Sequence, residues 1–347
     1  MQDNTTTKIT YLDKTVVRKA QNSVLETLLS EGIIIPNSCR AGVCQSCLMK
    51  ASDATKEYLP KESQKGLNQA EIKLGYFLAC SCYPEHDLSV GLPVQNLEAN
   101  HHVKIQSIQN LSASVYQLCL PEVIKYSPGQ FINLSFNTNQ TTYTRSYSIA
   151  SVPNLDSNII LHVKKHDHGV FGQWLESNQD LSKNIEVSGP FGQCFYTSDL
   201  EELTTGLLLV GISTGLAPLY GILRDALQQG YDKPIHLVFG AKTDDGLYLL
   251  EQLKELPDAN KNVQLHFVTQ KSFTQQSSSN TPVIDVLGNV DIYDYCANLP
   301  LDYSTQAAFI CGAQTFVNKL KKSLFLKGIA LRNIKSDAFV AATQIKQ

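Results

Sequence analysis

Residues 39–47 read CRAGVCQSC, and a further cysteine, Cys80, stands downstream of them. This C-x4-C-x2-C spacing with a distant fourth cysteine is the arrangement of plant-type 2Fe–2S sites. Four thiolates must surround two irons, and three of them come from one loop that wraps the cluster. Gly42 can adopt backbone angles closed to other residues, which lets loop amides donate to the sulfurs. The sequence therefore predicts that a 2Fe–2S cluster is bound by Cys39, Cys44, Cys47 and Cys80.

Two other metal sites fit these cysteines less well. Structural zinc usually takes two short C-x2-4-C knuckles, or one knuckle with histidines, and only one such spacing is present. A Rieske centre needs two histidine ligands in cysteine-like positions, and the sequence has none there. Cys82 is interpreted as a bystander, and the alternative is that it could serve as a ligand if Cys80 were lost.

Length and charge limit the class of protein. The chain has 347 residues, which predicts two or three domains, and its formal net charge of −3 argues against a nucleic-acid binder. Residues 1–7 lack the features of a signal peptide, and no apolar run approaches the ~18 residues of a membrane span. We expect a cytoplasmic protein without membrane or nucleic-acid partners, whose clustered thiols serve metal or redox chemistry.

The first two regions of the chain are rich in strand patterns. Residues 1–95 predict a β-rich module with a hairpin at 9–18 and a helix from the capping box of Ser23 and Glu26 to Gly32. A linker at 92–102 follows. Short strands then predict an antiparallel barrel or sandwich over 100–200, at residues 103–105, 115–118, 131–134, 146–149 and 159–163.

The pattern changes near residue 205. Apolar strands now alternate with helices, which is typical of a doubly wound parallel sheet. The strands are expected at 207–210, 236–239, 264–268 and 307–310, and the polar run 274–280 is expected to be a surface loop.

The segments Arg40–Cys47 and Phe77–Cys80 resemble the ferredoxin domain of iron–sulfur flavoprotein reductases that serve bacterial multicomponent oxygenases, such as benzoate dioxygenase. The resemblance covers nearly the whole chain. It implies a multidomain fold with α+β, β and α/β parts. These are a β-grasp ferredoxin domain at 1–95, an antiparallel β-barrel FAD-binding domain at 100–200, and a doubly wound parallel-sheet NAD(P)-binding domain at 205–347.

The family's R-x-Y-S flavin motif is matched at residues 145–148. The resemblance implies that Arg145 holds the pyrophosphate, that Tyr147 covers the isoalloxazine, and that Ser148 acts near flavin N5 as a catalytic residue. Arg offers a rigid fork and Tyr an aromatic face for these roles. Taken without the family, the motif is a strand fragment with a surface arginine. Ser146 and Val163 are also expected to line the flavin site.

The family's second flavin element is a G-x-x-S turn that opens a helix. Here it reads Gly169-Val170-Phe171-Gly172, followed by Gln173, so glycine stands where the family usually has serine. The amides of a helix N-terminus still face a phosphate, and we expect FAD at Gly169, Gly172 and Gln173, with FMN as the alternative.

The nicotinamide site is expected at a turn after a buried strand, GISTGLAP at 211–218. The family has glycine where Ser213 stands. The resemblance implies that the cofactor is bound by Gly211, Thr214, Gly215 and Pro218. The family's C-G-P segment is matched by Cys311 and Gly312, with Ala313 in place of proline.

The resemblance implies that Cys311 is catalytic and lies near the nicotinamide. The alternative is a small buried residue at a strand end. Asp337-Ala338-Phe339 resembles the acid-x-Phe pattern near the flavin, which adds Phe339 to the expected site.

The stretch 239–248 favours NADH over NADPH. It holds no arginine cluster for a 2′-phosphate, and the acidic pair Asp244 and Asp245 would repel one. NADPH remains the alternative because Lys242 and Lys271 lie in this part of the chain. His166 and His168 could in principle hold a metal, but their segment is more typical of a solvated surface loop.

These expectations combine into one function. Electrons pass from NADH through FAD and a 2Fe–2S cluster to a protein acceptor, which by resemblance is an oxygenase component, and the chain is expected to be a monomer. The alternatives are a reductase for a deoxysugar dehydratase, a stand-alone flavin or ferric reductase, and a non-catalytic redox-sensing protein.

Overall fold

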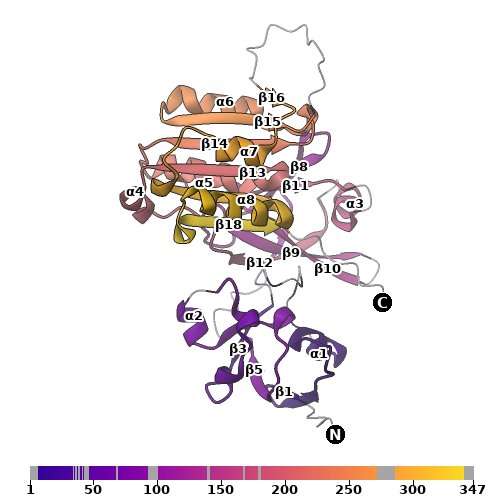
Figure 1. Cartoon of the computed structure of the whole chain (residues 1–347). Coiled ribbons are helices and arrows are strands. Elements are labelled where there is room, and N and C mark those ends of the chain that lie inside the picture. Colours follow the sequence, from indigo (N-terminus) through magenta and orange to yellow (C-terminus); the bar gives the residue numbers. More distant parts are fainter. Residues whose placement is uncertain are drawn as a thin grey trace. The chain divides into compact units, whose positions relative to one another are not determined.

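The computed structural model describes residues 7–33, 35, 37, 40, 42, 47–67, 69–92, 101–138, 141–166, 169–178, 181–271 and 286–339. Cys39, Cys44, His168 and the polar run 274–280 lie outside the described residues. The chain forms two compact units, one built mainly from residues 1–100 and the other from 101–142 with 147–339 (Figure 1). In the part of the chain that is described, no helix has both the length and the apolar character to cross a membrane.

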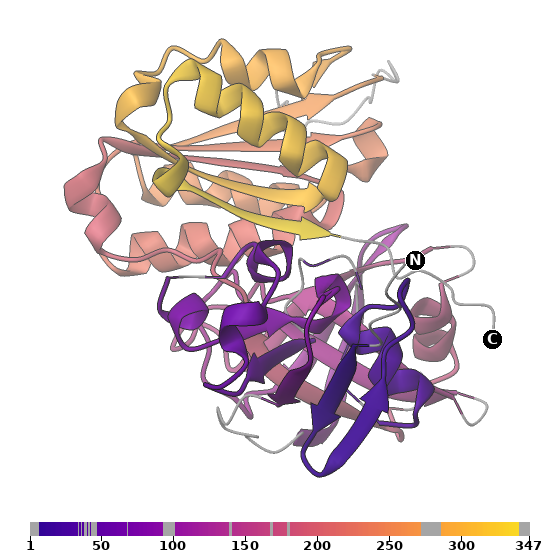
Figure 2. The ribbon, with the colours of Figure 1, turned by 60° about the horizontal axis from the view of Figure 1, so that its bottom comes forward.

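The first unit is a five-stranded mixed sheet with one main helix. Its order is β2-β1-β5-β3-β4, with β1 parallel to β5 and the other pairs antiparallel. Figure 2 shows the hairpin of β1 and β2 in indigo. The strands are β1 (Lys8–Tyr11), β2 (Lys14–Val17), β3 (Leu48–Ala51), β4 (Tyr76–Leu78) and β5 (Leu88–Gly91), and the helices of four or more residues are α1 (Val24–Ser30), η2 (Lys61–Gln64) and α2 (Gln69–Lys73).

The predicted hairpin and helix of this unit are confirmed. The Ser23 hydroxyl accepts from the Glu26 amide at 3.2 Å, and the Glu26 carboxylate accepts from the Ser23 amide at 2.8 Å. This capping box begins α1, and Gly32 follows its end at a φ of +74°. The apolar face of α1, with Leu25 and Leu28 buried, packs in the core of the module.

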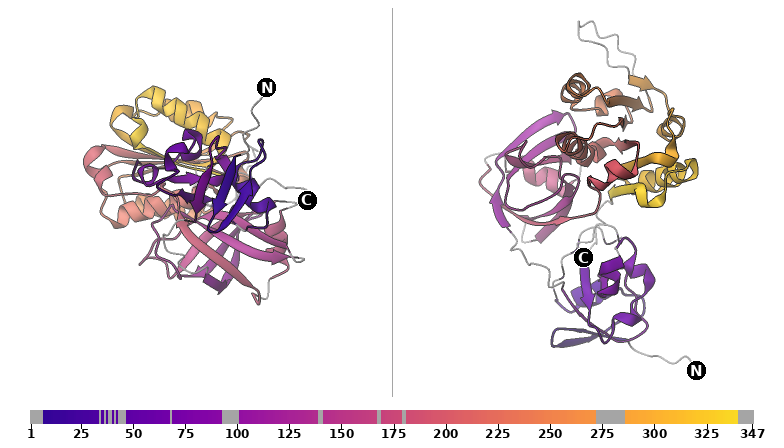
Figure 3. Two further views of the ribbon diagram at one scale, coloured as in Figure 1. Left: turned by 90° about the horizontal axis from the view of Figure 1, so that it is seen from below. Right: turned by 90° about the vertical axis from the view of Figure 1, so that its left-hand side faces the viewer.

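The second unit begins with seven strands in two sheets, ordered β10-β9-β12-β6 and β11-β8-β7. These strands are drawn in magenta tones in Figure 3. A bridge between Ile149 and Leu161 and a hydrogen bond from the Gln106 amide to the Cys119 carbonyl join the sheets, which gives the predicted barrel. The strands are β6 (His101–Lys104), β7 (Ser107–Ser112), β8 (Val115–Pro121), β9 (Phe131–Thr138), β10 (Thr141–Ser148), β11 (Asn158–Lys164) and β12 (Asn184–Phe191), with helix α3 (Val170–Glu176) between the last two.

The rest of the second unit is a six-stranded parallel sheet, ordered β16-β15-β14-β13-β17-β18. This confirms the predicted doubly wound sheet. The strands are β13 (Gly206–Ile212), β14 (Ile235–Ala241), β15 (Val263–Thr269), β16 (Val286–Gly288), β17 (Gln306–Ala313) and β18 (Ile334–Phe339), and the helices are α4 (Asp199–Leu203), α5 (Leu216–Gln228), α6 (Leu250–Ala259), α7 (Ile292–Ala297) and α8 (Gln314–Lys327).

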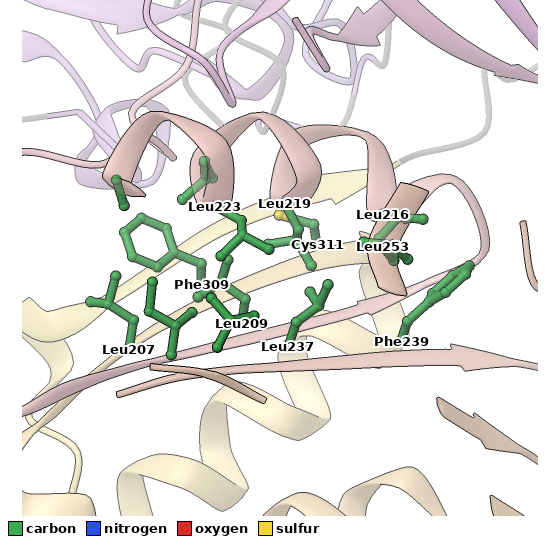
Figure 4. Close-up of a cluster of buried hydrophobic side chains, with 14 of the residues drawn as sticks. Leu207, Leu209, Leu216, Leu219, Leu223, Leu237, Phe239, Leu253, Phe309 and Cys311 are labelled. Carbon is green, nitrogen blue, oxygen red and sulfur yellow. The ribbon is translucent and has the colours of Figure 1, made fainter. Parts of the chain in front are cut away.

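The apolar run of β13 explains why both faces of this sheet are covered. Leu207 and Leu209 pack with α5, as Figure 4 shows, whereas Leu208 and Val210 pack with α7 and α8 on the other face. Figure 2 shows the yellow α8 and the salmon α5 on opposite sides of the strands. A strand buried on both faces needs a continuous apolar run.

Candidate functional site

The candidate cluster site lies where β3 and β4 meet. Cys47 immediately precedes β3, Cys80 follows β4, and Leu48 pairs with Leu78 across the two strands. The Cys47 sulfur accepts from the Cys80 amide at 3.5 Å, and the Cys80 sulfur accepts from the Gly42 amide at 3.3 Å. Backbone amides that point at two buried sulfurs stabilise thiolates in a metal site. The described part of the loop therefore fits a 2Fe–2S cluster.

Gly42 is required by the shape of this loop. Its φ is +72°, and an added Cβ would lie 3.3 Å from the Ser81 hydroxyl oxygen. The neighbouring Arg40 also has a positive φ of 53°, and its side chain donates to Asn37 at 2.9 Å. Within the described residues no three metal-ligating side chains come together, because Cys39 and Cys44 are outside that set.

Cys82 has a different environment from Cys80. Its side chain is fully buried in the core of the first unit. Burial raises the pKa of the Cys82 thiol to about 12, although a hydrogen bond with Ser63 opposes this. A neutral core thiol supports the interpretation of Cys82 as a bystander.

The predicted flavin residues lie on β10, β11 and α3 of the structure. Arg145 lies on β10 with its guanidinium 5.7 Å from the Tyr143 ring, and the Tyr147 ring packs 5.1 Å from Phe171 of α3. Gly169 is the N-cap of α3, and no side chain caps this helix. The first amides of α3 are therefore open to a phosphate. Ser146 is on β10, Gly172 and Gln173 are on α3, and Val163 is on β11 with its side chain buried.

Glycine at position 172 leaves space where the resemblance expects a serine. An added Cβ there would have no described atom within 4 Å.

Ser148, Cys311 and Asp337 come together at the carboxyl edge of the parallel sheet. The Ser148 hydroxyl donates to the Asp337 carboxylate at 2.6 Å, and Asp337 on β18 pairs in register with Cys311 on β17. Burial raises the pKa of Asp337 to about 6, against the opposing hydrogen bond from Ser148. The site therefore has a carboxyl group that exchanges a proton near neutral pH.

Asp337 is a candidate site residue that the sequence analysis did not include in the expected site. The only signal for it was the weak match of residues 337–339 to an acid-x-Phe pattern. Phe339 lies at the end of β18 and pairs in register with Ala313.

Cys311 is fully buried, and its sulfur lies 3.8 Å from the sulfur of Cys194, which also escaped sequence reasoning. Burial raises the pKa of the Cys311 thiol, with further contributions from Cys194 and the Asp337 charge. Cys311 is therefore a neutral thiol at physiological pH. The next residue must be glycine, because Gly312 has a φ of +143° and a Cβ would lie 2.8 Å from Ile212.

The nicotinamide turn connects β13 to α5 through a short helix at Ser213–Gly215. Gly215 packs so closely on β17 that a Cβ would lie 2.2 Å from the Cys311 carbonyl oxygen, which places the turn beside the Cys311 site. Gly211 is similarly close to Leu219 of α5, at 2.6 Å. Thr214 lies in the short helix and Pro218 in the first turn of α5.

Ser213 keeps the backbone conformation that a glycine would provide. Its φ is +52°, and its hydroxyl accepts from the Lys164 ammonium at 2.9 Å. Burial and the nearby charge of Lys242 lower the pKa of Lys164. Two cations thus lie near this turn. Lys242 is named in the sequence analysis only as a possible partner of a 2′-phosphate, and Lys164 is not named there.

The barrel and the parallel sheet are joined by polar contacts and one close approach. Arg224 of α5 donates to both carboxylate oxygens of Asp156, at 2.8 and 3.0 Å. His162 of β11 hydrogen-bonds with the Tyr248 hydroxyl at 3.1 Å, and burial lowers the pKa of His162 to about 3. A Cβ at Gly221 would lie 3.2 Å from the carbonyl oxygens of residues 149 and 150. These contacts position the nicotinamide turn relative to the flavin strand.

Three protein families match successive parts of the chain. The 2Fe-2S iron-sulfur cluster binding domain matches residues 9–85, the oxidoreductase FAD-binding domain matches 102–196, and the oxidoreductase NAD-binding domain matches 209–322.

Similar proteins match this chain over nearly their whole length. A toluate 1,2-dioxygenase electron transfer component of Pseudomonas putida is 25% identical, with 92% of this chain and 93% of the relative covered. The ferredoxin–NAD(P)⁺ reductase component of a naphthalene 1,2-dioxygenase system, also from Pseudomonas putida, is 27% identical, with 91% and 93% covered.

Among solved structures, an Amycolatopsis cytochrome P450 reductase has the same fold, with a TM-score of 0.62, 22% identity, and coverage of 97% of this chain and 100% of that one. A ferredoxin reductase in carbazole 1,9a-dioxygenase also has a TM-score of 0.62, with 20% identity and coverage of 96% and 98%. With a 2Fe–2S domain, an FAD-binding domain and an NAD-binding domain in one chain, the protein is an NAD(P)H-dependent iron–sulfur flavoprotein oxidoreductase, similar to these reductase components.

Proposed function

We propose that this reductase delivers electrons from NADH, through FAD and a 2Fe–2S cluster, to an oxygenase component. The named relatives serve toluate and naphthalene dioxygenase systems, and a third is the electron transfer component of a xylene/toluene monooxygenase. These relationships support an oxygenase as the acceptor.

The observation that carries the proposal is the group formed by Ser148, Asp337 and Cys311. A hydrogen bond of 2.6 Å ties the flavin-motif serine of the barrel to a carboxylate on the parallel sheet, in register with the nicotinamide-site cysteine. One compact unit thus contains residues for both partners of a hydride transfer.

When bound, FAD accepts hydride from the nicotinamide and the cluster carries electrons one at a time. Arg145 would hold the flavin pyrophosphate, and Tyr147 would cover the ring. Ser148 would hydrogen-bond the ring, and Asp337 would supply or take up a proton through the Ser148 hydroxyl. The neutral thiol of Cys311 adds no negative charge where the hydride leaves. The turn at Ser213–Gly215, which opens α5, would lie beside the nicotinamide pyrophosphate.

NADH is the proposed donor. Asp244, which follows β14, has a carboxylate oriented by the Thr269 hydroxyl at 2.9 Å, and a carboxylate there opposes a 2′-phosphate. The positive charges of Lys164 and Lys242 would attract a 2′-phosphate, so the preference for NADH over NADPH should be moderate. Comparing kcat/KM for NADH and NADPH tests this, and a higher value for NADPH would contradict it.

The finer organisation is also part of the proposal. We propose domain boundaries near residues 95 and 200, a monomeric state, a cytoplasmic location, and no membrane or nucleic-acid partner. Light scattering of the purified protein tests the monomer, and a dimer mass would contradict it.

The test of the function is anaerobic mixing of the FAD- and cluster-loaded protein with NADH. Flavin and cluster absorbance should bleach, and oxidised oxygenase component should restore the absorbance. A protein that fails to bleach with either nicotinamide is a sensor rather than an enzyme. A protein that bleaches but reduces free flavin as fast without its cluster is a stand-alone flavin reductase.

A further inference from the structure

A cavity lies at the far end of α5 from the nicotinamide turn. It has a volume of about 420 Å³ and is lined by barrel loops and by the last turn of α5. Its lining residues are Tyr126, Ser127, Pro128, Pro153, Asn154, Tyr196, Asp225, Gln228 and Gln229. The 13 residues of α5 rise about 20 Å in total, so this cavity is separate from the catalytic group.

Two polar groups at this cavity are buried and incompletely satisfied. Asp225 is only 8% exposed, and it has no ion pair among the described residues, since its one side-chain hydrogen bond is with Gln229. Tyr196 is 3% exposed, and within the described chain its hydroxyl has no hydrogen-bond partner. A buried carboxylate without a cation is costly, so native structures usually pair it.

The rest of the lining favours a positive ligand. Among the described residues of the lining there is no lysine or arginine, and neighbouring Arg224 is already bound to both oxygens of Asp156. The last turn of α5 presents the negative end of the helix dipole. Tyr126 and Tyr196 belong to the lining, and aromatic rings attract cations and pack against apolar stems.

We propose that this cavity binds an alkylammonium cation, with its charge on Asp225, a second polar contact at the Tyr196 hydroxyl, and its hydrocarbon stem against the tyrosine and proline side chains of the lining. A bare metal ion would find only one carboxylate and would leave most of the volume empty. The cation can be the end of a free amine or the side chain of a partner's lysine. Either would bridge the barrel and α5.

The test is titration of the holoenzyme with n-butylammonium chloride. Binding is measured by calorimetry and by NMR of the protein. The neutral analogue n-butanol and sodium chloride of equal ionic strength are the controls. Saturable binding of the cation, at least about tenfold tighter than that of n-butanol, is expected for a charge-assisted contact. Equal binding of butanol, or no saturable binding, would overturn the proposal.

Variants assign the binding to the cavity. Asp225→Asn should weaken butylammonium binding about tenfold, whereas Asp258→Asn, which removes an exposed charge on α6, should leave it unchanged. Loss of a buried unpaired charge should not lower the melting temperature, so Asp225→Asn should remain folded. Tyr196→Phe gives a second, independent variant and should also weaken binding. Unchanged affinity in both variants contradicts the assignment.

Two further titrations identify the source of the cation. Putrescine stands for a free amine, and the blocked tripeptide acetyl-Gly-Lys-Gly-amide stands for a lysine on a partner. Tighter saturation by one of them, lost in Asp225→Asn, supports the proposal and names that source. Failure of both to compete with butylammonium would overturn it.

Discussion

The cysteines of the two units show how surroundings decide what a buried thiol does. Cys47 and Cys80 each accept a backbone amide in a loop shaped by Gly42. The amide of Asp337 also acts on Cys311, but burial, the Cys194 thiol and the Asp337 carboxylate outweigh it and raise the pKa of Cys311. Amide donors prepare a sulfur to bind metal, whereas apolar burial keeps it a neutral thiol.

The largest expected effect comes from removing one of the two sulfurs that accept backbone amides, that of Cys47. Cys47→Ser should lose the cluster's visible absorbance and its reduced-state EPR signal. Reduction of cytochrome c, a one-electron acceptor, should fall by about a hundredfold, while NADH-driven reduction of a two-electron dye should persist. The control is Cys119→Ser, because Cys119 belongs neither to the cluster site nor to the Cys194–Cys311 pair. Retained cytochrome c activity would show that Cys47 is not a ligand.

A smaller effect is expected from neutralising the carboxylate beside Cys311. Asp337→Asn should slow flavin reduction by NADH roughly 10- to 100-fold, since proton exchange at Ser148 is lost. The measurement is stopped-flow absorbance across pH 4.5–8. The wild-type rate should change with an apparent pKa near 6, and the variant should lack this change. A profile that is the same in both proteins would contradict the role of Asp337.

The Asp337 carboxylate also predicts how the free energy of unfolding changes with pH. Its pKa is about 6 in the folded protein and near 4 when unfolded, so the folded state holds the extra proton between these values. The free energy of unfolding contributed by Asp337 is therefore present below pH 4 and is lost as pH rises through 6. Denaturant titrations of wild type and Asp337→Asn should converge at low pH.

Gly42→Ala tests the loop that supplies the amide donors. Its φ of +72° strains a side chain by about 1–2 kcal/mol, and the added Cβ also presses on Ser81. Cluster loss on dilution should become several-fold faster. Gly32→Ala is a matched control, because its φ is +74° and an added Cβ would contact nothing within 4 Å. Equal cluster loss in both variants would mean that backbone strain alone is responsible.

The smallest effect is expected at Cys82. Cys82→Ala should cost about 1 kcal/mol of unfolding free energy and leave the iron content unchanged, because this thiol belongs to the core. Iron analysis and thermal melting check both parts. Loss of iron would restore Cys82 as a candidate ligand.

Local patterns made much of this molecule predictable. The cysteine spacing, the Ser23 capping box and the apolar run of β13 each act within a few residues, so sequence reveals them. Asp337 and Ser148, Lys164 and Ser213, and Cys194 and Cys311 are pairs from distant segments. Their meeting depends on how the barrel packs on the parallel sheet, which no spacing in the sequence records.

Gly221 has a consequence for protein engineering. Helix α5 begins at the nicotinamide turn. At Gly221 the same helix packs closely on the barrel backbone at residues 149 and 150. A nucleotide domain grafted from another reductase would meet the barrel at this position first. A side chain at this position in the donor would require the barrel backbone to give by a few tenths of an ångström, so chimeras should be checked at this glycine before any catalytic residue is considered.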